Sequence, residues 1–156
     1  MTFIRLSIFS VFLMIWGTLP VYAQEKKKSS ALTDEFVQGV LKETRPRVKD
    51  LMISNDKFVG PETAEQLADP LLNTKQARRV IGRGLISGMA EWCKIDWRKK
   101  SFEPFMAQNR MQRFSEKQLA YIGMLHGYGM GVFRKSSKSK KCDEADLKRV
   151  HSYLGD

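Results

Sequence analysis

The stretch from Leu119 to Phe133 constrains the fold more than any other part of the chain, because its fifteen residues carry no formal charge. At about 100° per residue, its apolar side chains occupy nearly the whole circumference of a helix. Ser115 and Gln118 match a capping box in front of it, and Phe114 and Leu119 match the accompanying hydrophobic staple. A helix that is apolar on nearly every side belongs at the centre of a bundle, and this one is too short to be read as membrane-spanning.

Glycines interrupt this stretch at four positions, each costing about 1 kcal/mol relative to alanine in a helix interior. Three of them share one face with an alanine, and an earlier helical segment offers a matching pair of glycines. The two faces comprise Ala120, Gly123, Gly127 and Gly131 on one side and Gly84 and Gly88 on the other. We expect the two helices to cross there at close range. A bent helix that leaves a groove for a ligand is the alternative.

The rest of the chain also has helical patterns. Further helices are expected over 33–45 with a short continuation to 52, over 60–67, 74–92 and 101–114, and after Cys142. The segment Arg134–Lys141 is expected to be a solvated basic loop, and no segment shows the alternation typical of a strand. The sequence therefore predicts an all-α fold, a compact bundle of five or six short helices around a buried glycine-rich helix, with one disulfide.

The first 23 residues have the features of a signal peptide. Arg5 precedes an apolar run from Leu6 to Trp16, and the small residues Val21 and Ala23 occupy the positions that a signal peptidase reads. We expect residues 1–23 to be a cleaved signal peptide, 24–31 a disordered basic leader and 32–156 a single helical domain. A retained membrane anchor is the alternative. The expected location is the periplasm or the extracellular space.

Export determines how the two cysteines are interpreted. In an oxidising compartment Cys93 and Cys142 are expected to form one disulfide. A loop of this length gives a stabilisation of about 4 kcal/mol by chain-entropy arithmetic. A reactive thiol pair is the alternative, but the Cys-x-x-Cys spacing that lowers a thiolate pKa is missing.

The sequence contains no complete catalytic or cofactor-binding motif. His126 and His151 are not spaced for a metal site, and His126 on an apolar helix is expected to be a hydrogen-bonded core residue. A glycosidase would need two carboxylates facing a cleft, for which Glu91 and Asp96 could be nominated. We expect no metal, no cofactor and no catalytic residue, and Asp96 is expected to fix a turn or pair with an arginine.

The charge balance suggests the kind of partner. The chain has 27 Lys and Arg against 17 Asp and Glu, a net charge of +10, of which Arg5 leaves with the signal peptide. Such a charge attracts acidic partners, which in the envelope are lipid head groups, acidic glycans or an acidic protein. Nucleic acid lies in the wrong compartment. A basic surface that only maintains solubility is the alternative.

An aromatic cluster brackets Cys93. Trp92, Trp97, Arg98 and Phe102 are candidate partner-binding residues, because tryptophan and arginine are enriched at binding hot spots. Packing against the disulfide is the structural alternative for these side chains.

A family resemblance covers about a third of the chain. The stretch Leu125–Val132, followed by Cys142, Tyr153 and Leu154, resembles two groups of small exported helical proteins. One is the HdeA-type periplasmic acid-stress chaperones, in which a Gly-Tyr-x-x-Gly helix and a disulfide recur. The other is the Rap1a/Tai immunity group, which protects the periplasm from secreted cell-wall amidases. The resemblance implies a helical disulfide-linked fold, but no functional residue can be carried over from it.

These observations favour a non-enzymatic exported protein that binds another envelope protein or an acidic envelope component. A chaperone-like protein would bind clients through apolar surface exposed by partial opening. An immunity or inhibitor protein would present a fixed surface to one cell-wall hydrolase. An envelope enzyme acting on cell wall or lipid is the alternative from a different class. The oligomeric state is not indicated.

Overall fold

The structure is a computed structural model that describes residues 32–54, 56–137 and 139–155. Its helices and strands are, in chain order, α1 (Asp34–Thr44), the 3-10 helix η1 (Arg45–Asp50), β1 (Met52–Ser54), β2 (Lys57–Phe58), α2 (Ala64–Ala68), α3 (Thr74–Trp92), the π-helical turn η2 (Arg98–Phe102), α4 (Glu103–Met111), α5 (Glu116–Ser136) and α6 (Glu144–Leu154). This element order confirms the all-α class. Within the described ranges, no helix is long and apolar enough to span a bilayer. The predicted signal peptide (1–23) and basic leader (24–31) lie outside the described residues.

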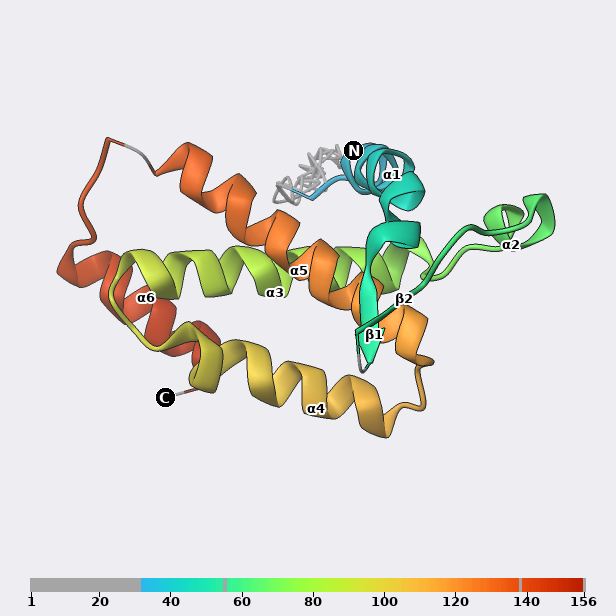
Figure 1. Cartoon of the computed structure of the whole chain (residues 1–156). Coiled ribbons are helices and arrows are strands. Elements are labelled where there is room, and N and C mark those ends of the chain that lie inside the picture. The colour runs from blue at the N-terminus through green and yellow to red at the C-terminus, as the bar shows by residue number, and fades with distance from the viewer. Residues whose placement is uncertain (1–31, 55, 138, 156) are drawn as a thin grey trace, which may run out of the picture.

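Helices α3 and α5 form the centre of the bundle. Figure 1 shows them crossing in the middle of the molecule, with α1 above, α4 below and α6 near one end, while α2 projects at the other. The core around them includes Val37 from α1, Ile81 from α3, and Tyr121, Ile122 and Leu125 from α5, each no more than 1% exposed. The uncharged stretch is therefore the central helix that the sequence predicted.

Side-chain caps determine where the two central helices begin. At the start of α5, Ser115 Oγ accepts from the backbone N–H of Gln118 (3.2 Å), and Gln118 Oε1 accepts from the N–H of Ser115 (3.0 Å). This reciprocal pair confirms the predicted capping box. Asn73 and Gln76 form the same arrangement at the start of α3, with distances of 2.9 and 2.8 Å. Both helices thus have satisfied N–H groups in their first turns.

The predicted helical continuation is correct as far as Asp50, where η1 ends, and a short hairpin, β1–β2, begins at Met52 instead. The chain leaves its helical conformation at Leu51, and Met52 pairs with Phe58. The backbone N–H of Val59 donates to the carbonyl of Leu51 (2.9 Å). Met52 and Phe58 are each 55% exposed, so this cross-strand pair lies outside the core, and the strands show no alternating pattern in the sequence. Asp56, immediately before β2, has a φ of 61°.

Helices α3 and α5 touch through their backbones. A methyl group on Gly84 would overlap the carbonyl oxygen of His126 and would lie 3.0 Å from the Cα of Gly129. A methyl group on Gly129 would in turn overlap the carbonyl oxygen of Ile81. Gly88 continues the contact one turn later, against Met130. The predicted crossing at Gly84 and Gly88 is therefore correct.

The glycine face predicted on α5 is wrong. A Cβ on Gly123, Gly127 or Gly131 would have no atom within 4 Å outside its immediate neighbourhood, whereas Gly129 faces α3. Gly127 is two residues from Gly129 and lies about 200° around the helix. The bulky side of α5 offers more apolar area to bury than a face of glycines does, and it carries Gly129 with it. Helix α5 therefore packs on α3 with the side opposite to the predicted glycine face.

The disulfide between Cys93 and Cys142 is present, with a Cα–Cα distance of 5.2 Å across 49 residues of sequence. Cys93 follows the last residue of α3, and Cys142 precedes α6. The bond therefore attaches the C-terminal helix to the end of the central pair, as the sequence predicted.

The segment before Cys142 begins as helix and is held by an ion pair near its end. Helix α5 continues through Ser136, two residues past Arg134. Beyond it, Lys140 Nζ lies 2.7 Å from Oδ2 of Asp146, whose side chain is 8% exposed. A charge-assisted hydrogen bond of this kind holds the segment against the first turn of α6. The predicted basic loop is thus wrong for 134–136, which belong to α5, and correct for the described residues that follow them, which are non-helical and mostly exposed.

The backbone contact between α3 and α5 gives a paired test on one helix. Gly129→Ala places a methyl group against the carbonyl of Ile81 and is expected to lower the free energy of unfolding by about 1–3 kcal/mol. Gly127→Ala has open space and is expected to raise it by up to about 1 kcal/mol, because alanine is the better helix former. Urea unfolding followed by circular dichroism measures both. Equal effects of the two variants would contradict the contact.

Candidate functional site

The most deeply buried polar network among the described residues consists of three side chains, each from a different helix. Ser87 on α3 donates from its Oγ to the Oγ of Ser101 on η2 (2.7 Å). The Oγ of Ser87 also lies 2.9 Å from Nε2 of His126 on α5. The three residues are 0%, 1% and 2% exposed, respectively. Buried polar groups of this kind are satisfied by one another, so the network confirms the prediction that His126 is a hydrogen-bonded core residue.

The direction of these hydrogen bonds decides what the histidine can do. Because the one proton of Ser87 goes to Ser101, Nε2 of His126 is the donor toward Ser87 and carries a proton. A histidine that activates a serine must instead accept the serine proton. The geometry therefore describes a structural bridge between α3, η2 and α5, in which Ser87 is not an activated nucleophile.

Aromatic rings enclose the imidazole of His126. The ring centroids of Phe102, Trp97 and Phe105 lie 4.8, 6.1 and 6.4 Å from that of His126. Burial among these rings and, to a smaller extent, the positive charge of Arg83 together lower the pKa of His126 to about 4. The histidine is therefore neutral at pH 7 and resists protonation while the chain is folded.

The structure divides the predicted partner-binding residues into two groups. Trp92 belongs to the disulfide end: its Nε1 donates to the carbonyl of Lys140 (3.0 Å), and its ring lies 5.7 Å from that of Phe133. Lys140 Nζ also lies 5.9 Å from the centre of the Trp92 ring, in a cation–π arrangement. Trp92 thus holds the segment before Cys142 in place, which is the structural role weighed for it from the sequence.

Trp97, Arg98 and Phe102 form the second group, at η2. Trp97 packs edge-on against Phe102, with centroids 6.1 Å apart, and both rings are partly exposed. The Arg98 side chain is 73% exposed, and its Nε lies 3.6 Å from Oε1 of Glu103. The half-buried rings rest on the network of His126, while the arginine extends into solvent. This group has the composition of a binding surface on a fixed base.

The two carboxylates nominated for glycoside hydrolysis have other partners. Both oxygens of Glu91 accept from the guanidinium of Arg134 on α5, at 2.7 and 2.8 Å. Asp96 Oδ1 accepts from the backbone N–H of Lys99 (3.2 Å) at the start of η2. Asp96 therefore fixes a turn, as the sequence predicted, and Glu91 joins the two central helices. Within the described part of the chain, no group of three or more histidine, cysteine or acidic side chains could hold a metal ion.

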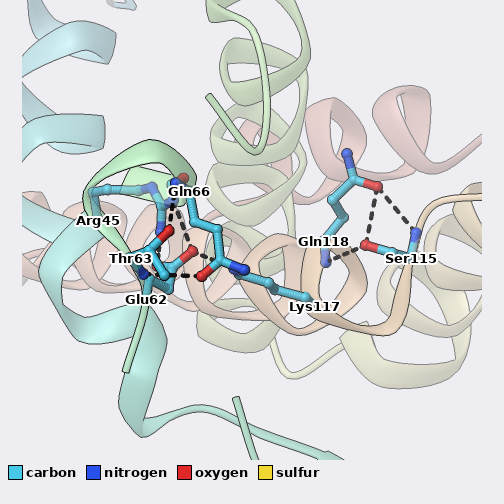
Figure 2. A network of polar contacts seen from close by, with 7 residues as sticks. All are labelled: Arg45, Glu62, Thr63, Gln66, Ser115, Lys117 and Gln118. Atoms are coloured by element: carbon cyan, nitrogen blue, oxygen red, sulfur yellow. Dashed lines mark hydrogen bonds and ion pairs between the residues drawn. The ribbon is translucent and has the colours of Figure 1, made fainter. Parts of the chain in front are cut away.

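A second polar cluster joins the loop before α2 to the helices on either side. Figure 2 shows the carboxylate of Glu62 between Arg45 and Lys117, and Arg45 Nη2 lies 2.9 Å from Oε1 of Glu62. The Glu62 side chain is 3% exposed. The hydrogen bond from Arg45 lowers the pKa of Glu62 against the opposing effect of burial. Arg45 also donates to the carbonyl of Gln66 (2.7 Å), so the cluster fixes α2.

Sequence reasoning missed Ser87, Ser101 and Glu62. Serine and glutamate at these positions have no distinctive spacing, and their partners come from elements far apart along the chain. The available signal was His126 itself, because a polar side chain inside an uncharged helix requires a buried partner.

Comparison with family models, with curated proteins and with solved structures gave no match.

The neutral state of His126 predicts a specific pH dependence. Its folded pKa of about 4 lies below the ordinary value of 6.5, so the unfolded chain takes up a proton first as the pH falls. Stability is then lost from about pH 6.5 down to about pH 4, by about 3 kcal/mol in total, and no further below that. His126→Gln keeps a donor near the Nε2 position but cannot titrate. Unfolding free energies between pH 7.5 and 5 should fall less steeply in this variant, and equal slopes would contradict the burial of a neutral histidine.

Proposed function

We propose that this protein is an exported, non-enzymatic binding protein of the cell envelope that holds one partner on the surface of η2. The observation that supports this proposal is the placement of Trp97 and Arg98 on a fixed base. Trp97 rests on Phe102 and on His126, whose imidazole is bound to Ser87. A side chain that is already ordered loses little conformational entropy on binding, so it can contribute most of its contact energy to affinity.

The charge around η2 suggests an acidic partner. Lys94, Arg98 and Lys99 are exposed near Trp97, and the 79% exposed Lys99 side chain has its Nζ 4.0 Å from Asp96. Opposite charges on a partner would speed association and orient it on this surface. An envelope protein with an acidic patch, or an acidic envelope component, meets this requirement.

Two features support export. The first 23 residues have the charge and hydropathy pattern of a signal peptide. The disulfide between Cys93 and Cys142 is the kind of bond that persists in an oxidising compartment. The periplasm or the extracellular space is therefore the proposed location.

Among the binding functions, an inhibitor or immunity protein with a fixed surface has the stronger support. The central helices meet through their backbones at Gly84 and Gly129, and the disulfide holds the end of the pair. Such a scaffold favours one complementary partner over many. A chaperone-like protein is the second candidate, and the buried His126 favours it because protonation at acid pH would loosen the core. An envelope enzyme using Glu91 and Asp96 has less support, since both carboxylates are bound elsewhere.

Affinity capture from the native envelope fraction tests the proposed surface. The mature chain is expected to retain a single partner at near-equal stoichiometry, and Arg98→Glu should weaken this capture about tenfold or more by reversing a charge at the contact. Arg47→Glu is the matched control, because Arg47 is also exposed (68%) and also lies near one glutamate, Glu43.

Equal capture by both variants would contradict a contact at η2. Retention of many unrelated proteins, together with suppression of their aggregation on acidification, would favour the chaperone-like function instead. Replacing Trp97 is less informative, because its ring packs against the core network and its loss would disturb the fold.

A further inference from the structure

A hollow of about 380 Å³ lies between α3, η2, α4 and the end of α6. Its lining includes Arg83, Lys100, Ser101, Phe105 and Met111, and none of the described residues that line it is acidic. The volume is within the range of sites that accept small organic ligands. The combination of cations, a hydroxyl and apolar side chains indicates a ligand that is charged at one end and apolar at the other.

Arg83 supplies a positive charge that the fold does not neutralise. Its guanidinium lies 5.9 Å from the centre of the Phe105 ring and is only partly exposed. Arg79 lies over the same ring at 5.8 Å, but its Nη2 donates to Oε1 of Gln108. Among the described residues, Arg83 has no hydrogen-bond acceptor and no ion-pair partner. A partly desolvated guanidinium in this state binds a carboxylate favourably through two parallel N–H donors.

Ser101 adds a hydroxyl donor to the lining of the hollow, but it is only 1% exposed, so only a ligand atom that reaches the wall of the hollow contacts it. Its Oγ accepts the proton of Ser87, which leaves its own proton for a different acceptor. No other described residue accepts that proton. The network of His126 and Ser87 holds this hydroxyl in place from behind.

Apart from Gln108, the remaining lining is apolar and determines what the other half of the ligand is. Pro104, Phe105, Met111 and Leu154 line the hollow, and Met111 is 83% exposed. A flexible thioether with this exposure can cover a bound apolar group, and a hydrocarbon there would remove apolar surface from water.

We propose that this hollow binds a monocarboxylate that carries an apolar group of several carbon atoms. Arg83 and Ser101 hold the carboxylate, and Phe105 and Met111 pack on the apolar group. Lys100 at the hollow already takes part in another contact, so one guanidinium remains and matches a single negative charge. The site is separate from the proposed partner surface at Arg98 and does not depend on it.

Titration of the mature chain with octanoate tests this site, using calorimetry and the amide NMR signals of Ser101, Phe105 and Met111. Octanoate is expected to bind at one site and to shift these signals. Octanol, which lacks the charge, and acetate, which lacks the apolar group, should bind at least about tenfold more weakly, because each loses one half of the contacts.

Substitutions locate the binding. Arg83→Gln and Met111→Asp should each weaken octanoate about tenfold or more, whereas Arg110→Gln, a matched change at an exposed arginine of the same region that does not line the hollow, should leave it unchanged. A second probe, N-acetyl-leucine, distinguishes the two natural compounds that could supply such a carboxylate. If it binds more tightly than octanoate, the ligand is a peptide carboxyl terminus; if it binds more weakly, the ligand is a fatty acid. Both ligands belong to the proposed class. No saturation by either probe up to about 10 mM, or equal binding by the Arg83 and Arg110 variants, would overturn the proposal.

Discussion

The close approach of α3 and α5 at Gly84 and Gly129 is the constraint on which the other features depend. Where two helix backbones touch, neither a side chain nor water separates them, and the residues one turn away are held in fixed relative positions. This contact places Ser87 on α3 beside His126 on α5. Through Ser101, the same geometry fixes η2, which carries the proposed partner surface and one wall of the proposed ligand site.

Two buried titratable residues, His126 and Glu62, make the stability of the scaffold depend on pH. Neutral His126 resists protonation in the core, so acid removes its contribution between about pH 6.5 and pH 4. The fold favours the neutral form of His126 but the charged form of Glu62, because Arg45 stabilises the Glu62 carboxylate and lowers its pKa. Its contribution is present above the ordinary value of 4.5 and is lost as the pH falls through the lower folded value. The two groups therefore weaken the fold in successive steps on acidification.

The sequence predicted the features that local rules determine. The capping box at Ser115 and Gln118 depends on residues three apart, and the pairing of Cys93 with Cys142 follows from there being two cysteines. The crossing of the central helices was also predictable, because Gly84 lies on the apolar stripe of α3.

The sequence could not predict which side of a helix packs inward, nor contacts between residues that are far apart along the chain. The side of α5 that carries Gly129 packs against α3, and the face of Gly127 does not, because the first side buries larger side chains. Which side packs better depends on the shape of α3. The strand pair Met52 and Phe58 of the hairpin is exposed, so the sequence carries no alternating apolar pattern there. Of the candidate site, the sequence identified Trp97 and Arg98, but it could not show that Trp92 serves a different end of the molecule.

Hydrogen exchange of the backbone amides tests the central contact most directly. With the disulfide intact, the amides of 81–88 on α3 and 125–130 on α5 should be the slowest to exchange, and those of the exposed helix α2 should be among the fastest. Exchange of the two central segments at rates similar to those of α2 would show that the helices separate readily, and would contradict a scaffold built on their backbone contact.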